Sequence, residues 1–191
     1  MRSMPVLETE RLIVRPFTLD DLNDVHRILD IELADADFGT EGAQALNERR
    51  EWLRWTTLNY AQLAKLYQPP YGERAVVLKD THELIGAVGY VPCLNLFGQL
   101  ASSTPMHFTS TEFGLYWAIA PAHQRRRHAT EAARAMVAYA LEQLKLGRIV
   151  ATTTYDNVAS IGVMRKLGMR IETNPFPDPP WLQVVGVLET R

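Results

Sequence analysis

Cysteine is nearly absent from this sequence: Cys93 is the only one in 191 residues, so no intrachain disulfide can form. A single cysteine agrees with a reducing compartment, and the first residues lack the apolar run of a secretory signal. No stretch approaches the roughly 18 to 20 uninterrupted apolar residues of a membrane-spanning helix. These absences predict a cytoplasmic protein without a membrane partner.

An excess of positive charge is also absent. Lys and Arg number 20 against 22 Asp and Glu, which gives a net charge of −2 and argues against a nucleic-acid partner. Repeats, low-complexity segments and interdomain linkers are missing as well. With 47% hydrophobic residues, the chain is long enough to bury a core without disulfides or a structural metal, so we expect a single domain over residues 1–191 and no metal site.

What the sequence does contain is a local cluster of positive charge. Three consecutive arginines, Arg125 to Arg127, lie in a loop between an apolar strand pattern and an Ala-rich helix pattern. The first turn of a helix has backbone N–H groups without intrahelical partners, and guanidinium groups bind phosphate oxygens in a bidentate fashion. The loop therefore indicates a site for a pyrophosphate or a phosphate. A solvated run of charge or a nucleic-acid patch is the alternative.

Hydrophobic periodicity divides the chain into strands and helices. Helices are expected after a cap at Thr18, over about 41–67, from the arginine loop to about 145, and over 157–167. The second is long enough that we expect a break in it, with Leu53 and Leu63 on its apolar stripe and Arg49 off that stripe. The expected strands cover 11–17, 74–79, 84–91, 112–119, 148–155, 169–173 and 182–189, with a long loop over 92–111. This order predicts one mixed-sheet α/β domain.

Four segments carry a resemblance to a known family. They are residues 7–17 (LETERLIVRPF), 112–117 (EFGLYW), 124–132 (QRRRHATEA) and 157–169 (NVASIGVMRKLGM). In this order they are similar to the GNAT N-acetyltransferases, and in particular to the branch typified by ribosomal-protein alanine N-acetyltransferases. The resemblance implies one mixed, mostly antiparallel sheet of about seven strands, flanked by about four helices and splayed between the fourth and fifth strands. It also implies acetyl-CoA as the donor and an amine nitrogen as the acceptor.

The resemblance places the donor on the arginine loop, where the sequence departs from the family pattern. The signature Gln/Arg-x-x-Gly-x-Gly/Ala falls on Gln124, Arg127 and Ala129, so Arg127 replaces the central glycine, and Arg125 replaces a second frequent glycine. Because glycine permits a positive φ and a close backbone approach to phosphate, two outcomes are open. Either the loop keeps helical dihedrals that arginine can adopt and its amides cradle the pyrophosphate, which we favour, or guanidinium contacts partly restore a weakened affinity. The donor-binding residues expected on this basis are Trp117, Ala118, Ile119, Gln124, Arg125, Arg126, Arg127, His128, Ala129, Thr130, Asn157 and Ser160.

Acetyl transfer needs a base for the acceptor ammonium and a proton donor for the departing thiolate. Glu112, at the start of the strand expected to line the donor, is the candidate base, and an exposed strand-end carboxylate is its alternative. The family's usual donor, a tyrosine seven residues after Asn157, is replaced here by Met164, which cannot donate a proton. Ser160 is then the candidate donor, with Tyr155 as a further one. Asn157 resembles the residue that holds the pantetheine arm.

The acceptor is the least readable part of the sequence. Three acidic residues after the first helix would attract a cationic amine: Glu32, Asp35 and Asp37. A peptide or protein N-terminal amine and a small-molecule amine both stay open as acceptors, as does a homodimer. Two rival functions are kept. One is a coenzyme A-binding sensor without turnover, suggested by Arg127 and Met164, and the other is an RNA- or ribosome-associated module that uses the arginine cluster.

Overall fold

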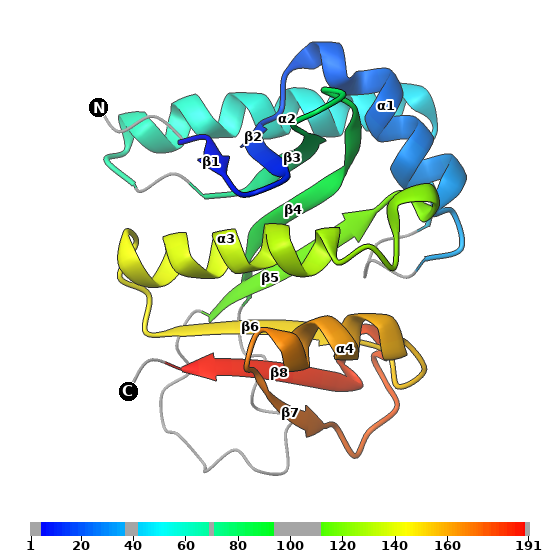
Figure 1. The fold of residues 1–191 in the computed structure, drawn as a ribbon, viewed down its shortest axis with the longest axis vertical. Helices are drawn as coiled ribbons and strands as arrows, with labels where there is room; N and C mark the ends of the chain where they lie inside the picture. The colour runs from blue at the N-terminus through cyan, green and yellow to red at the C-terminus, as the bar shows by residue number, and fades with distance from the viewer. Residues whose placement is uncertain (1–4, 37–41, 69–70, 94–111, 190–191) are drawn as a thin grey trace.

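The fold is one eight-stranded mixed sheet with helices on both faces (Figure 1). The computed structural model describes the chain except residues 1–4, 37–41, 69–70, 94–111 and 190–191. The strands run in the order β1-β2-β3-β4-β5-β6-β8-β7 and are β1 (Leu7–Glu8), β2 (Leu12–Pro16), β3 (Glu73–Leu78), β4 (Leu84–Cys93), β5 (Glu112–Ile119), β6 (Arg148–Thr153), β7 (Arg170–Thr173) and β8 (Val184–Glu189). The α-helices are α1 (Leu22–His26), α2 (Leu46–Lys65), α3 (His128–Glu142) and α4 (Val158–Lys166).

The predicted α/β class is confirmed, and so is the mostly antiparallel sheet, in which β5 and β6 form the parallel pair. All seven expected strands are present. The eighth, β1, consists of two residues that pair antiparallel with β2, where Leu7 lies opposite Val14. Two residues are too short to show an alternating pattern, so periodicity could not find this strand.

The helices differ from the expectation in two places. The break expected between residues 41 and 67 was wrong, because α2 is a single helix of 20 residues and contains neither proline nor glycine. It begins at Leu46, where the Glu48 carboxylate accepts a hydrogen bond from the Ala45 N–H at 2.8 Å. The first helix is composite: a 3-10 turn (Leu19–Asp21) leads into α1, which continues as a π-helical segment to Glu32.

Each face of the sheet has its own hydrophobic cluster. On one face, Val14, Val76 and Leu115 pack with Met136 of α3 and Met164 of α4. On the opposite face, the core is formed by strand residues and by residues of the first two helical regions: Phe17, Val25, Ile28, Leu53, Ala75, Val77, Leu84, Ala87 and Ala120. Successive strand residues alternate between these clusters, so a residue's position in its strand fixes the face on which it lies.

The sheet opens between β5 and β6. β5 pairs with β4 along its whole length, from Gly86 opposite Ile119 to Cys93 opposite Glu112, but its pairing with β6 is limited to Gly114 opposite Val150. Beyond Gly114 the two strands diverge, and both α3 and α4 begin at the open end (Figure 1). The predicted splay between the strands 112–119 and 148–155 is therefore confirmed. Among the described helices, none combines the length and apolar character needed to cross a membrane.

Candidate active site

Two cavities open onto the splay. The first, which we call the loop cavity, has a volume of about 490 Å³ and is lined by the arginine loop, by the first turn of α3 and by α4. The second, the sheet cavity, has a volume of about 530 Å³ and lies over β3, β4 and β5. The two share Trp117 and Ala118 of β5, and Asn157 and Ser160 at the start of α4. Molecules bound in the two cavities would therefore meet at the open part of β5.

The loop cavity collects the residues that sequence analysis assigned to the donor. Trp117, Ala118, Ile119, Gln124, Arg125, Arg127, His128, Ala129, Thr130, Asn157 and Ser160 all line it. Arg126 is the exception, because it lines neither cavity, although its carbonyl oxygen holds the loop in place. Lys166 of α4 adds a further cation to the lining. Cations and the free N–H groups at the start of α3 make this cavity suitable for a phosphorylated ligand.

The backbone of the arginine loop does not keep right-handed helical dihedrals. Arg125 has φ of 58° and Arg127 has φ of 68°, so both lie in the left-handed region that glycine adopts without strain. The expectation that the loop keeps helical dihedrals that arginine can adopt was therefore wrong, while the expectation that its amides cradle a pyrophosphate stays a prediction. The turn keeps the shape that glycine would favour, and the two arginines adopt it at an energetic cost.

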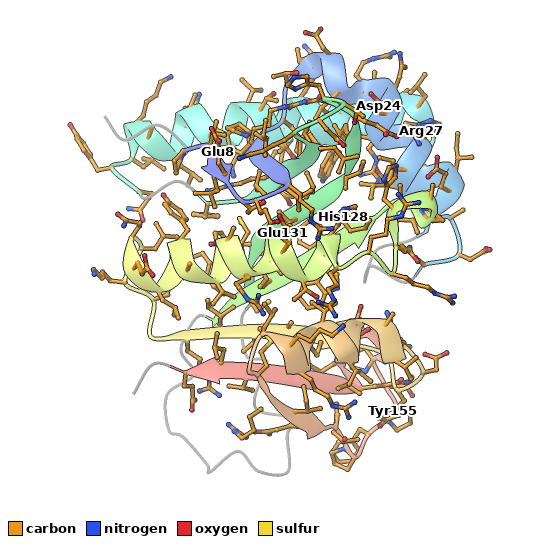
Figure 2. All side chains as sticks on the ribbon, in the orientation of Figure 1. Glu8, Asp24, Arg27, His128, Glu131 and Tyr155 are labelled. Carbon is orange, nitrogen blue, oxygen red and sulfur yellow. The ribbon has the colours of Figure 1, made fainter. Side chains whose placement is uncertain are left out.

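A network of hydrogen bonds from the opening segment fixes the loop against α3. Arg11 donates to the Glu131 carboxylate through Nε at 2.8 Å and Nη2 at 2.6 Å, and Nη2 also donates to the Arg126 carbonyl at 3.1 Å. Thr9 Oγ1 donates to the same carboxylate at 2.6 Å. Figure 2 shows Glu131 and His128 on the side of α3 that faces β1 and β2. Burial alone would raise the pKa of Glu131, but the hydrogen bonds from Thr9 and Arg11 lower it, so the carboxylate stays charged.

Two further contacts complete this end of the loop cavity. Gln124 Nε2 donates to the Ile119 carbonyl at 2.9 Å, which ties the loop to the end of β5. A His128 ring nitrogen lies 3.2 Å from the His123 carbonyl. Burial and the nearby Arg11 charge lower the pKa of His128, so its imidazole is neutral at pH 7. Arg125, Arg127 and Lys166 bring positive charge to the cavity at this pH.

The sheet cavity contains an acid that sequence reasoning missed. Glu73, the first residue of β3, lies on the same face as Ala75 and Val77 and lines the cavity. In the pairing register, Glu73 lies opposite Gly89 of β4, and Gly89 lies opposite Tyr116 of β5. A Cβ atom on Gly89 would come within 2.7 Å of the Tyr116 ring, so the glycine allows this ring to lie across β4 toward Glu73. The available signal in the sequence was that Glu73 occupies the same alternate positions of the strand as the apolar residues Ala75 and Val77.

The protonation of these two groups follows from their burial. Removal from water raises the pKa of the Glu73 carboxyl above its ordinary value. It raises the pKa of Tyr116 as well, and the neighbouring Glu73 charge adds to that effect, so the phenol is protonated at neutral pH. A carboxylate with a raised pKa accepts protons more readily than an exposed one. Glu73 can therefore take a proton from a group bound in the cavity.

Arg49 is the second charged group of the sheet cavity that the sequence did not indicate. Its side chain is 10% exposed and binds Asp30 through Nε at 2.8 Å and Nη2 at 2.7 Å. Its guanidinium lies 4.8 Å from the centre of the Trp52 ring, and both residues line the cavity. The expectation that Arg49 lies off the buried stripe of α2 was wrong. A charged residue four positions before Leu53 was the available signal.

The start of α4 presents an amide and a hydroxyl to both cavities. The Asn157 side-chain oxygen accepts a hydrogen bond from the Ser160 N–H at 3.0 Å and so caps the helix, while within the described residues its amide nitrogen donates to no group. The Ser160 hydroxyl likewise has no hydrogen-bond partner among them. Met164 is fully buried in the core and lines neither cavity. The hydroxyl at the open end of the splay therefore comes from Ser160, and residue 164 contributes no group there.

Of the remaining predicted site residues, those that the structure describes line neither cavity. Tyr155 lines neither cavity and donates its hydroxyl proton to the Asn174 carbonyl at 2.5 Å, next to the end of β7 (Figure 2). Glu112 begins β5 opposite Cys93, but its side chain lies outside the described residues. Glu32 pairs with Arg27, Asp35 is exposed, and neither lines a cavity. Asp37 also lies outside the described residues. In the described part of the chain, no cluster of three or more His, Cys, Asp or Glu could hold a metal ion.

Comparison with known proteins gives consistent results. The family described as Acetyltransferase (GNAT) domain matches residues 11–170. YoaA of Bacillus subtilis, named as an uncharacterized N-acetyltransferase, is 30% identical over 169 residues, which cover 88% of this chain and 84% of YoaA. A GNAT-family acetyltransferase from Bacillus anthracis superposes with a TM-score of 0.70 at 22% identity and covers 96% of both chains. RimL, a ribosomal L7/L12 α-N-protein acetyltransferase solved in complex with coenzyme A, superposes with a TM-score of 0.67 at 11% identity, over 97% of this chain and 98% of RimL. The match to the family over most of the sequence, on a splayed sheet of the expected topology, shows that this chain belongs to the GNAT family of N-acetyltransferases.

Proposed function

We propose that this protein transfers the acetyl group of acetyl-CoA to a primary amine by direct attack, with donor and acceptor bound at the same time in the two cavities. The observation that carries the proposal is that the cavities meet at Trp117, Ala118, Asn157 and Ser160. A donor in one cavity and an amine in the other would bring a thioester carbon and a nitrogen together there. Such proximity is itself a large part of catalysis.

The residues of the loop cavity fit acetyl-CoA. N–H groups at the start of α3, together with Arg125 and Arg127, supply donors for the diphosphate, and Lys166 supplies a further cation. The backbone of β5 beyond Gly114 is unpaired on its β6 side and can hydrogen-bond the amide groups of the pantetheine arm. The amide nitrogen of Asn157, which donates to no group in the described part of the chain, is a third contact for that arm. RimL, which shares the fold, has been solved with coenzyme A.

Glu73 is the base that the geometry favours. It lies in the sheet cavity, its pKa is raised, and Tyr116 lies in the same row of the sheet, beyond Gly89. Glu73 would accept the proton of the acceptor ammonium, directly or through water, so that the amine nitrogen can attack the thioester carbon. Glu112, the base suggested by the sequence, is the first residue of β5 and is the alternative.

Two other groups would stabilise the reaction. Backbone N–H groups of residues 117–119 lie in the open part of β5 and can donate to the oxyanion that forms when the nitrogen attacks. As the C–S bond breaks, the Ser160 hydroxyl can donate a hydrogen bond to the thiolate of coenzyme A. Tyr155 is a weaker candidate for that donation because its hydroxyl is already bound to Asn174.

The test is thiol release from acetyl-CoA in the presence of a panel of primary amines, with calorimetry of coenzyme A binding on the same protein. Binding together with amine-dependent release supports the proposal. Binding without release from any amine supports the sensor instead. Absence of binding at millimolar coenzyme A overturns both, and RNA binding that weakens with salt would then support the RNA-associated module.

A further inference from the structure

The charges in the sheet cavity bear on the kind of acceptor that it takes. Among its described lining residues, Glu73 and Arg49 are the two with charged side chains, and all the others are uncharged. Both also act on one group: burial raises the pKa of Tyr116, the charge of Glu73 adds to that rise, and the charge of Arg49 opposes it. A carboxylate and a guanidinium are therefore both close enough to the same tyrosine to affect its ionisation. This inference rests on the proposed function, since it takes the sheet cavity as the acceptor site.

Arg49 is held rigidly by its neighbours. Its Nε and Nη2 atoms both donate to Asp30, whose side chain is 1% exposed and also accepts the Gln44 N–H at 2.9 Å. The ring of Trp52 lies beneath the guanidinium plane. Two of the three guanidinium nitrogens are therefore fixed, and the rotamer entropy of the arginine is already lost before any ligand binds.

The third nitrogen, Nη1, is left without a partner. No hydrogen bond joins it to any other residue that the structure describes, although the side chain is nine-tenths buried and lines the cavity. Nη1 is not among the fully buried atoms without a partner, so it is accessible from the cavity, and a ligand oxygen that enters can accept from a donor whose orientation is already fixed. Because Asp30 already balances the charge of Arg49, either a carboxylate or a neutral carbonyl oxygen can serve.

We propose that the acceptor is an amine of the amino-acid class, which presents its ammonium group to Glu73 and a carboxylate or carbonyl oxygen to Nη1 of Arg49. Its side chain would contact the apolar lining, which includes Leu29, Trp52 and Trp181. A diamine or polyamine is disfavoured, because it has no oxygen for Arg49 and places a second positive charge near the guanidinium. Arg49 is then the residue that selects the acceptor.

The experiment compares matched acceptors on the unaltered protein. Phenylalanine, leucine and alanine are each assayed beside their amides and beside the corresponding decarboxylated amines, 2-phenylethylamine, isoamylamine and ethylamine, by thiol release from acetyl-CoA. The best amino acid or amide is expected to exceed its decarboxylated partner by about 10- to 100-fold in kcat/KM, as for one hydrogen bond to a charged donor. The amides distinguish the two oxygen sources, because a free amino acid offers a carboxylate, whereas an amino-acid amide offers a neutral carbonyl, as a peptide does.

A variant of Arg49 links that preference to the residue. Arg49→Lys keeps a positive charge beside Asp30 but loses the fixed nitrogen fork, so the preference should fall to below about threefold while thiol release persists. Arg50→Lys changes the exposed neighbour on α2 and should leave the preference unaltered. If Arg49→Lys does not fold, the comparison on the unaltered protein decides alone.

The outcomes separate this inference from the proposed function. Equal use of amino acids and their decarboxylated partners would overturn the role of Arg49 and leave amine acetylation standing. Preference for a polyamine such as spermidine would do the same. If the protein binds coenzyme A but none of the amines supports thiol release, the proposed function and the inference are overturned together.

Discussion

Replacing Arg127 by glycine should make the protein more stable. Arg127 has φ of 68° and ψ of 9°, and a non-glycine residue in this left-handed region carries a cost of about 1–2 kcal/mol. Glycine removes that cost, but it also makes the unfolded chain more flexible, which lowers the free energy of unfolding by about 0.4–1 kcal/mol. The midpoints of these two ranges give an expected net gain of about 0.8 kcal/mol in the free energy of unfolding, or a rise in Tm of about 2–3 °C for a domain of this size.

The matched control for Arg127→Gly is the neighbouring residue. Arg126 is also exposed but has no positive φ, so Arg126→Gly should lower the Tm or leave it unchanged. Thermal unfolding of both variants, followed by circular dichroism, measures the difference. If Arg127→Gly is no more stable than Arg126→Gly, the dihedral reasoning fails.

The same variant tests how the loop would hold the donor. Arg127 lines the loop cavity, and Arg127→Gly removes its guanidinium while leaving the backbone N–H groups and the start of α3 in place. If these N–H groups supply most of the interaction, the Kd for coenzyme A should change by less than about threefold. A loss of more than about tenfold would show that the guanidinium itself holds the phosphates. Stability and affinity are thus expected to separate in one substitution.

Three further substitutions test the site. Glu73→Gln should lower kcat by about 100-fold or more. It should also raise the Tm at pH 7–8, because burial disfavours the charged carboxylate of the unaltered protein. Since burial raises the pKa of Glu73 in the folded state, this gain in Tm should vanish below the ordinary pKa of glutamate, and a gain that persists at pH 4 would contradict the assignment. Ser160→Ala should lower kcat by about tenfold or more with little change in the KM for acetyl-CoA, and an unaltered kcat would exclude its hydroxyl as a proton donor. Arg11→Ala should raise the KM for acetyl-CoA by about three- to tenfold at constant kcat, because it frees the Arg126 carbonyl and Glu131, and Arg11→Lys should restore part of the affinity.

Much of the fold could be predicted because its signals are local. Alternation of apolar residues identified seven strands, and the resemblance supplied the splay between β5 and β6. The errors arose where an element is very short, or where contacts with distant residues determine the local structure. Two residues of β1 depend on pairing with β2, and α2 stays unbroken because nothing within it interrupts the hydrogen bonds. The left-handed dihedrals of Arg125 and Arg127 follow from the shape of the loop and oppose the intrinsic preference of arginine.

The two halves of the site differ in how far the sequence predicted them. The loop cavity is formed largely by short segments, 117–119, 124–125 and 127–130, together with α4, so a motif could identify most of it. The sheet cavity joins Arg49 of α2, Glu73 of β3 and Tyr116 of β5, which are far apart in the sequence. Only the pairing register brings Glu73, Gly89 and Tyr116 into one row. Composition directed attention to the acids after α1 instead, because a cluster of like charge is easier to notice than one buried carboxylate.

The opening of the sheet is what allows the two halves to work together. If β5 and β6 paired fully, the backbone of residues 117–119 would be bonded to β6, and it could neither hold a pantetheine arm nor stabilise an oxyanion. Because pairing is limited to Gly114 and Val150, this backbone is exposed between a cavity on the α3 and α4 side and one on the α1 and α2 side. A donor and an acceptor can then approach Trp117 and Ala118 from opposite faces of the sheet without competing for space. The two substrates would therefore be expected to bind simultaneously, and initial-rate kinetics should give intersecting lines in double-reciprocal plots, whereas parallel lines would indicate an acetylated enzyme and contradict direct attack.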